Sequence, residues 1–130
     1  MKKKIIVGLC LTTSLYASDI VIDKDTDLIW QDNSTIVSKT YKEAIRYCQN
    51  LSLGGYDDWR LPNIDELMSI SDKSRYNPAV KKIFKHTKNS YYWSSSRYKG
   101  NSSRAWIVYF GDGYGHGGDI SSYNYVRCVR

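Results

Sequence analysis

The sequence lacks the residue sets on which most enzymatic chemistry depends. It contains only two histidines, His86 and His116, and neither lies at a spacing that favours a Ser/His/Asp arrangement or a metal site shared with cysteines. Both histidines are expected to be exposed to solvent. The scarcity of such groups predicts a protein that is not an enzyme and holds no cofactor or metal.

The aspartates likewise lack the spacing of an EF-hand calcium loop. In the segment that starts at Asp23, the sixth position is Leu28, where glycine is needed, and the twelfth is Ser34, where glutamate is expected. This excludes an EF-hand. A weaker calcium site that uses Asp112 and Asp119 stays open, although a glycine-rich segment with aspartates is also typical of plain turns.

The sequence has no apolar run long enough to cross a bilayer. The run 5–11 follows three lysines and leads to a small-residue exit at Ala17, a layout typical of a secretory signal peptide. We therefore expect residues 1–17 to be removed and residues 18–130 to form one domain. The expected location is secreted or periplasmic, with no stable insertion into a membrane.

Cysteine is also scarce, with three in the chain, and Cys10 lies in the segment that is expected to be removed. The two that remain, Cys48 and Cys128, are expected to form a disulfide, because the predicted compartment is oxidising. The alternative is a pair of buried free thiols.

Two helices can be placed from their capping residues. Thr40 with Glu43, and Asn63 with Glu66, have the spacing of a capping box, in which side chains of the first turn satisfy free backbone amides. The first helix is expected to end at Gly54–Gly55, because glycine accepts the left-handed conformation. A third helical turn is expected from Asn77–Pro78, with Val80, Ile83 and Phe84 on its apolar side.

The other elements are predicted strands and loops. Strands are expected over 20–22, 28–31, 91–96, 104–110 and 125–130, with 104–110 central because it is apolar on both faces, and a loop is expected over 111–118. Trp30, Trp59, Trp93 and Trp106 are expected in the core, and Arg60 is expected to pair with Asp57, Asp58 or Glu66. The result is an α+β domain: an antiparallel sheet, two main helices, long loops and one disulfide.

Five motifs occur in this order: Leu28–Gln31, Gly54–Asn63 with Glu66–Leu67, Tyr92–Ser96, Ala105–Gly111 and Val126–Arg130. Together they resemble the bacterial Lcl C-terminal domain family, a domain of unknown function in secreted and surface proteins. The resemblance covers residues 20–130 and implies a C-type-lectin-like fold, related to formylglycine-generating enzymes and to variable proteins diversified by retroelements. It implies no chemistry, because members of the family are binding modules or uncharacterised. The oxidase activity of formylglycine-generating enzymes is not implied either, because it needs a pair of free thiols that the expected disulfide would consume.

Positive charge is concentrated in the second half of the chain. Without residues 1–17 the formal charge is only +3, but residues 18–66 carry −5 and residues 67–130 carry +8. We call the cations between Lys73 and Arg104 the basic band, because no acid interrupts them. Lys81, Lys85 and Lys88 are expected on one side of the third helical turn. Lys24, Lys39 and Lys42 are expected to lie apart from the band.

Tyrosine-rich loops accompany the basic band, and tyrosine with serine and asparagine is typical of binding surfaces. Together they predict recognition of an anionic polysaccharide or a surface protein, rather than nucleic acid, by a non-catalytic module. The alternatives are a module for protein–protein assembly and a charged face that only contacts solvent. The candidate ligand-binding residues are Lys81, Lys82, Lys85, Lys88, Arg97, Tyr98, Lys99, Arg104, Tyr114 and Tyr123.

Overall fold

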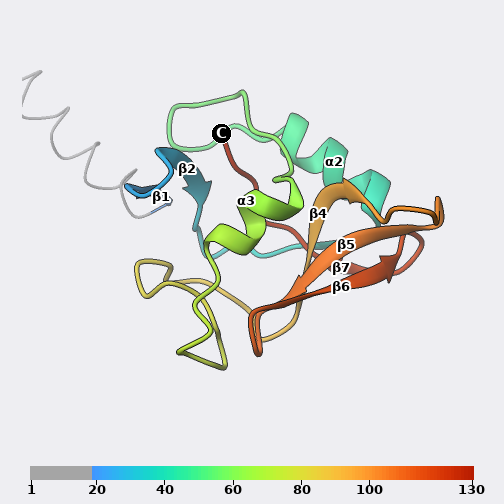
Figure 1. The fold of residues 1–130 in the computed structure, drawn as a ribbon. Helices are drawn as coiled ribbons and strands as arrows, with labels where there is room; N and C mark the ends of the chain where they lie inside the picture. Colours follow the sequence, from blue (N-terminus) through green and yellow to red (C-terminus); the bar gives the residue numbers. More distant parts are fainter. Residues whose placement is uncertain (1–18) are drawn as a thin grey trace, which may run out of the picture.

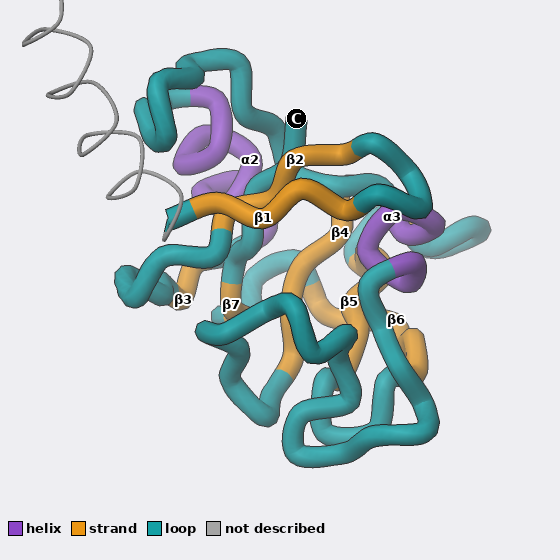
Figure 2. Tube along the Cα trace, turned by 90° about the vertical axis from the view of Figure 1, so that its left-hand side faces the viewer, coloured by secondary structure: helices purple, strands orange, loops and turns teal. Residues whose placement is uncertain are grey.

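The computed structural model describes residues 19–130, so the expected signal peptide at residues 1–17 lies outside the described residues. A hairpin sheet contains β1 and β2, and a five-stranded sheet has the order β3-β7-β4-β5-β6 (Figures 1 and 2). The elements are β1 (Ile20–Asp23), β2 (Leu28–Gln31), β3 (Ser38–Lys39), α2 (Tyr41–Gln49), α3 (Ile64–Ser69), β4 (Tyr91–Arg97), β5 (Arg104–Tyr109), β6 (Tyr114–Asp119) and β7 (Asn124–Tyr125). Neighbouring strands run antiparallel except β4 and β7. The α+β prediction is confirmed.

Both predicted capping boxes form. The Glu43 carboxylate accepts the Thr40 N–H at 3.1 Å, and at α3 the Asn63 side chain accepts the Glu66 N–H at 2.8 Å. However, α2 ends at Gln49, well before Gly54–Gly55. Its last turn closes through Asn50, whose N–H bonds back into the helix, and the two glycines serve a later turn between Leu53 and Tyr56.

The prediction of a third helical turn from Asn77–Pro78 is wrong. Residues 78–88 form an irregular segment that is held by distant backbone partners: the Ala79 N–H donates to Phe110, and the Lys81 N–H donates to Ile70. Val80 and Phe84 are buried, so their spacing of four reflects contact with the core rather than a helix. Lys81, Lys85 and Lys88 therefore do not share one helix face.

The predicted loop over 111–118 is mostly the edge strand β6. Its glycines allow close approach of aromatic side chains from neighbouring segments, because a Cβ atom at Gly117 would lie 2.7 Å from the Tyr98 ring. Trp106 stacks beside Tyr98 and is only half-buried, so its predicted place in the core is wrong. β5 is interior, as expected for a buried strand, although β4 occupies the middle of the sheet.

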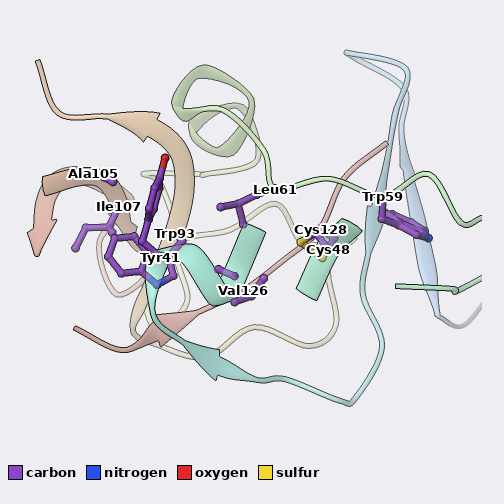
Figure 3. Close-up of a cluster of buried hydrophobic side chains, with 10 residues drawn as sticks. Tyr41, Cys48, Trp59, Leu61, Trp93, Ala105, Ile107, Val126 and Cys128 are labelled. Carbon is purple, nitrogen blue, oxygen red and sulfur yellow. A yellow bond between two sulfur atoms is a disulfide. The ribbon is translucent and has the colours of Figure 1, made fainter. Parts of the chain in front are cut away.

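Two hydrophobic cores lie on the two faces of the main sheet, because side chains alternate along its strands. Trp93 and Ile107 belong to the core beneath α2 (Figure 3), whereas Tyr92 and Val108 belong to the core beneath α3. Trp30, Trp59 and Trp93 are buried, as predicted. Among residues 19–130, no helix is long and apolar enough to cross a membrane.

The predicted disulfide is confirmed and joins Cys48 of α2 to Cys128, with the two Cα atoms 5.5 Å apart (Figure 3). Both cysteines are fully buried in the core beneath α2. The backbone N–H of Cys128 donates to the side-chain oxygen of Gln31 at 3.0 Å. The bridge therefore ties the helix to the hairpin sheet as well as to the end of the chain.

The sequence predicts one long strand over 125–130, but residues 126–130 lie outside the strands of the main sheet. They form backbone hydrogen bonds with several other segments. Ile29 and Arg130 exchange two backbone hydrogen bonds, and Val129 exchanges two with Arg60. β7 itself covers only Asn124–Tyr125. Segments that are distant in the sequence thus pair with the same five residues.

Arg60 was predicted to pair with Asp57, Asp58 or Glu66, and its partner in the structure is Glu66. Two hydrogen bonds of 2.7 Å join the guanidinium to the Glu66 carboxylate, which also accepts the Asn63 N–H. These hydrogen bonds lower the pKa of Glu66 below its ordinary value of 4.5, and the bond from Arg60 has the largest effect.

We expect this pair to add an acid-sensitive contribution to stability. Because the folded pKa is lowered, the contribution is present above pH 4.5 and is lost as the pH falls through the lowered value. Glu66→Gln should therefore flatten the fall of the melting temperature below that pH, with a loss at neutral pH of at most about 1 kcal/mol. Thermal melts across this pH range test it, with Asp65→Asn as the neighbouring control. Equal slopes for wild type and Glu66→Gln would contradict it.

Candidate functional site

The structure divides the ten predicted ligand-binding residues into separate groups. Lys81, Lys82, Lys85 and Lys88 lie on the irregular segment 78–88, whereas Arg97, Tyr98, Lys99 and Arg104 lie at the turn between β4 and β5. Figure 1 shows this turn and that segment on opposite sides of the molecule. Tyr114 begins β6 and Tyr123 precedes β7, and both are exposed. The basic band is therefore not one surface.

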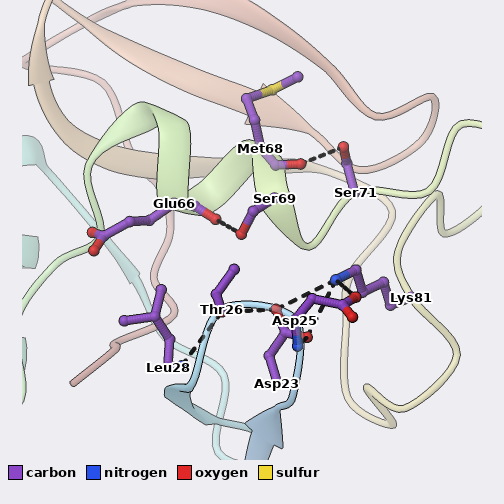
Figure 4. A network of polar contacts seen from close by, with 9 residues as sticks. All are labelled: Asp23, Asp25, Thr26, Leu28, Glu66, Met68, Ser69, Ser71 and Lys81. Carbon is purple, nitrogen blue, oxygen red and sulfur yellow. Dashed lines mark hydrogen bonds and ion pairs between the residues drawn. The ribbon is translucent and has the colours of Figure 1, made fainter.

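Lys81 does not offer a free charge to a ligand. Its Nζ atom lies 3.2 Å from a carboxylate oxygen of Asp23, the last residue of β1, and 3.0 Å from one of Asp25, in the turn between β1 and β2 (Figure 4). The band contains no acid along the sequence, but the fold brings two acids to it. The lysine serves to join the hairpin sheet to the segment 78–88.

The segment 78–88 is anchored by a buried ion pair between Asp32 and Arg127, which was not predicted from the sequence. Asp32 and Arg127 are 2% and 4% exposed, and their side chains meet at 3.1 Å. The Asp32 carboxylate also accepts the backbone N–H groups of Lys85 at 2.8 Å and His86 at 3.0 Å. The sequence signal for this pair is Arg127, a charged residue between the apolar Val126 and Cys128.

Arg127 holds the same segment through further contacts. Its guanidinium donates to the His86 carbonyl and, at 3.1 Å, to the Thr87 hydroxyl, and it lies over the ring of Phe84. Burial lowers the pKa of Arg127, while the charge of Asp32 opposes that shift. His86 is consequently half-buried, contrary to its predicted exposure, whereas His116 is exposed as predicted.

The β4–β5 turn brings together the other predicted cations, Arg97, Lys99 and Arg104, and a pair of aromatic rings. Tyr98 and Trp106 stack with ring centroids 4.6 Å apart, and the Arg104 guanidinium lies 5.8 Å from the Tyr98 ring. Arg97 donates to the Ser102 carbonyl, and Arg104 donates to the Gly117 carbonyl. These contacts fix the side chains without neutralising their charge. An open concavity of about 610 Å³ lies at this turn, lined by Arg97, Tyr98, Lys99, Gly100, Asn101 and Ser102.

The acid nearest to this group in register is Asp119, which lies opposite Arg104 on β6. The hydroxyl and backbone N–H of Ser121 hold its carboxylate at 2.7 and 2.8 Å. These two hydrogen bonds lower the pKa of Asp119, and the bond from the Ser121 hydroxyl has the largest effect. The charge of Arg104 lowers this pKa as well. Among residues 19–130, none of Arg97, Lys99 and Arg104 forms an ion pair.

Two of the three lysines expected to lie apart from the band, Lys24 and Lys42, lie beside residues of it. Lys24 shares a groove with Lys81 and Lys82, and Lys42 shares another with Arg97. Only the three-dimensional arrangement reveals these neighbours, because their separations in the sequence exceed fifty residues.

The calcium alternative receives no support from the geometry. Asp112 and Asp119 stand at the two ends of β6, where their carboxylates accept hydrogen bonds from Tyr114 and Ser121. Within the described range 19–130, no cluster of three or more His, Cys, Asp or Glu residues could hold a metal ion.

These features define a small disulfide-linked α+β domain with a cationic and aromatic surface at one end of its sheet. The sequence profile of the Lcl C-terminal domain family matches residues 19–130. The chain therefore belongs to the Lcl C-terminal domain family, as the motifs indicate. A comparison with curated proteins found no match.

Proposed function

We propose that the domain is a secreted or periplasmic, non-catalytic module that binds an anionic polysaccharide, sulfated or acidic, through the β4–β5 turn. The observation that carries the proposal is a set of three cations at this turn, Arg97, Lys99 and Arg104, without an ion-pair partner among the described residues. They accompany the Tyr98–Trp106 stack, and the Arg104 guanidinium lies beside its Tyr98 ring. The C-type-lectin-like character of the fold stays a prediction alongside it.

The physical argument combines charge with contact area. Cations that contact a polyanion release its condensed counterions, so binding is favoured at low salt and weakens as salt rises. The aromatic stack adds a rigid surface on which the apolar face of a sugar ring can pack at small entropic cost. The segment 78–88 offers exposed lysines without such a stack, and its Lys81 is already paired.

Retention on a column of heparin, used as a sulfated probe, tests the proposal. We expect Arg97→Gln/Lys99→Gln to elute at clearly lower salt than wild type, and the slope of log affinity against log salt to fall by roughly one unit for each cation replaced. Lys82→Gln/Lys88→Gln removes the same charge from the opposite side and should change elution little. Thermal melts confirm that both variants fold.

Two outcomes would contradict the proposal. Equal losses from the two double variants would indicate unspecific cation exchange. No retention of the wild type at about 0.15 M salt, where the screening length is about 8 Å, would refute an anionic ligand and favour a surface protein as partner.

A further inference from the structure

A second concavity lies between the first turns of α2 and the end of β6. The Tyr41 N–H donates to the Ile120 carbonyl at 3.2 Å, which sets the helix beside the strand end (Figure 1). The groove has a volume of about 490 Å³, within the size range of small-molecule sites. Its lining residues are Thr40, Tyr41, Lys42, Ile45, Arg97, Ile120 and Ser121.

The floor of this groove is apolar and fixed in place. Ile45 and Ile120 are half-buried and pack against the core beneath α2. Tyr41 is buried, and its hydroxyl donates to the Ser95 carbonyl at 2.6 Å. A ligand would therefore meet a preformed apolar surface and would not have to order it.

The rim of the groove carries two cations. Lys42 is exposed, and the Arg97 guanidinium lies 4.9 Å from the Tyr41 ring centroid. Neither forms an ion pair within residues 19–130. The nearby acids already have partners in the chain, because Glu43 accepts the Thr40 N–H and Asp119 accepts Ser121.

We propose that the α2–β6 groove binds a small monocarboxylate with an aliphatic or aromatic tail. The tail would pack on Ile45 and Ile120, and the carboxylate would lie between Lys42 and Arg97, which supply charge-assisted hydrogen bonds. The volume and the two cations fit one small anion rather than a polymer. The assignment does not depend on polysaccharide binding at the β4–β5 turn, although Arg97 borders both sites.

Isoleucine methyl spectra of the labelled protein test this assignment, with 3-phenylpropionate as the probe. We expect saturable shifts at Ile45 and Ile120. Ile22 and Ile83, which are 58% and 42% exposed in the groove beside Lys81, should not respond and serve as internal controls. Lys42→Gln should weaken binding about fivefold, and Lys82→Gln should not change it.

The amide of the same acid separates charge recognition from simple apolar contact. It should bind more weakly than the carboxylate by at least the same factor. The proposal is overturned if the amide binds equally, if all four isoleucines shift together, or if no saturable shift appears in the millimolar range. Because heparin retention is measured separately, either proposal can fail without the other.

Discussion

Removal of the Cys48–Cys128 disulfide is expected to lower the free energy of unfolding by roughly 4.5 kcal/mol. The bridge joins cysteines 80 residues apart, and the chain-entropy model assigns this value to a closed loop of that length. For a domain of this size the loss corresponds to a fall in melting temperature of roughly 20 °C. Thermal unfolding of Cys48→Ala/Cys128→Ala against wild type measures it, and alanine avoids a buried polar group.

Reductant provides the control for this prediction. It should lower the melting temperature of the wild type toward that of the double variant and leave the variant unchanged. Free thiols that titrate in the native wild type, or equal melting of the two proteins, would contradict the bridge as a source of stability.

Asp32→Ala is expected to destabilise the domain by about 4 kcal/mol. The change leaves the Arg127 charge buried without its partner, a situation that costs several kcal/mol. It also removes the acceptor of two backbone N–H groups, those of Lys85 and His86. Urea unfolding measures the loss, and hydrogen exchange of these two amides should accelerate together, because one carboxylate holds both.

Asp25→Ala is the matched control, since its side chain is 80% exposed in an ion pair with Lys81. It should cost at most about 1 kcal/mol. The double variant Asp32→Ala/Arg127→Met should cost less than the sum of its single changes, because neither charge then remains buried alone. A loss for Asp32→Ala no larger than that for Asp25→Ala would show that the buried pair is dispensable.

Features that depend on neighbouring residues were predictable from the sequence. The starts of both helices were predicted from a capping residue with a glutamate three residues later. The strands β4 and β5 were predicted from the apolar residues in their sequences. The segment 78–88 and the strand β6 were not predictable in this way. Their shapes depend on partners elsewhere, such as Phe110 for Ala79 and the Tyr98 ring for Gly117.

The candidate site shows the same division. The composition identifies the cations of the β4–β5 turn, because they are close together in the chain. It cannot reveal that Asp23 neutralises Lys81 across 58 residues, or that Asp32 meets Arg127 across 95. Nor can it place Lys42 beside Arg97. Charge along the sequence therefore predicted the kind of surface, but not which cations share it.

The position of the segment 126–130 bears on when the domain can fold as the chain is made. Ile29, Gln31 and Arg60 form backbone hydrogen bonds with residues of this segment, which is synthesised after residues 19–125. Cys48 likewise emerges 80 residues before Cys128. Before residues 126–130 are made, the hairpin sheet therefore lacks its C-terminal backbone partner and Cys48 lacks the cysteine with which it pairs. Folding of the domain is delayed until then, and an incomplete chain is open to mispairing with other molecules.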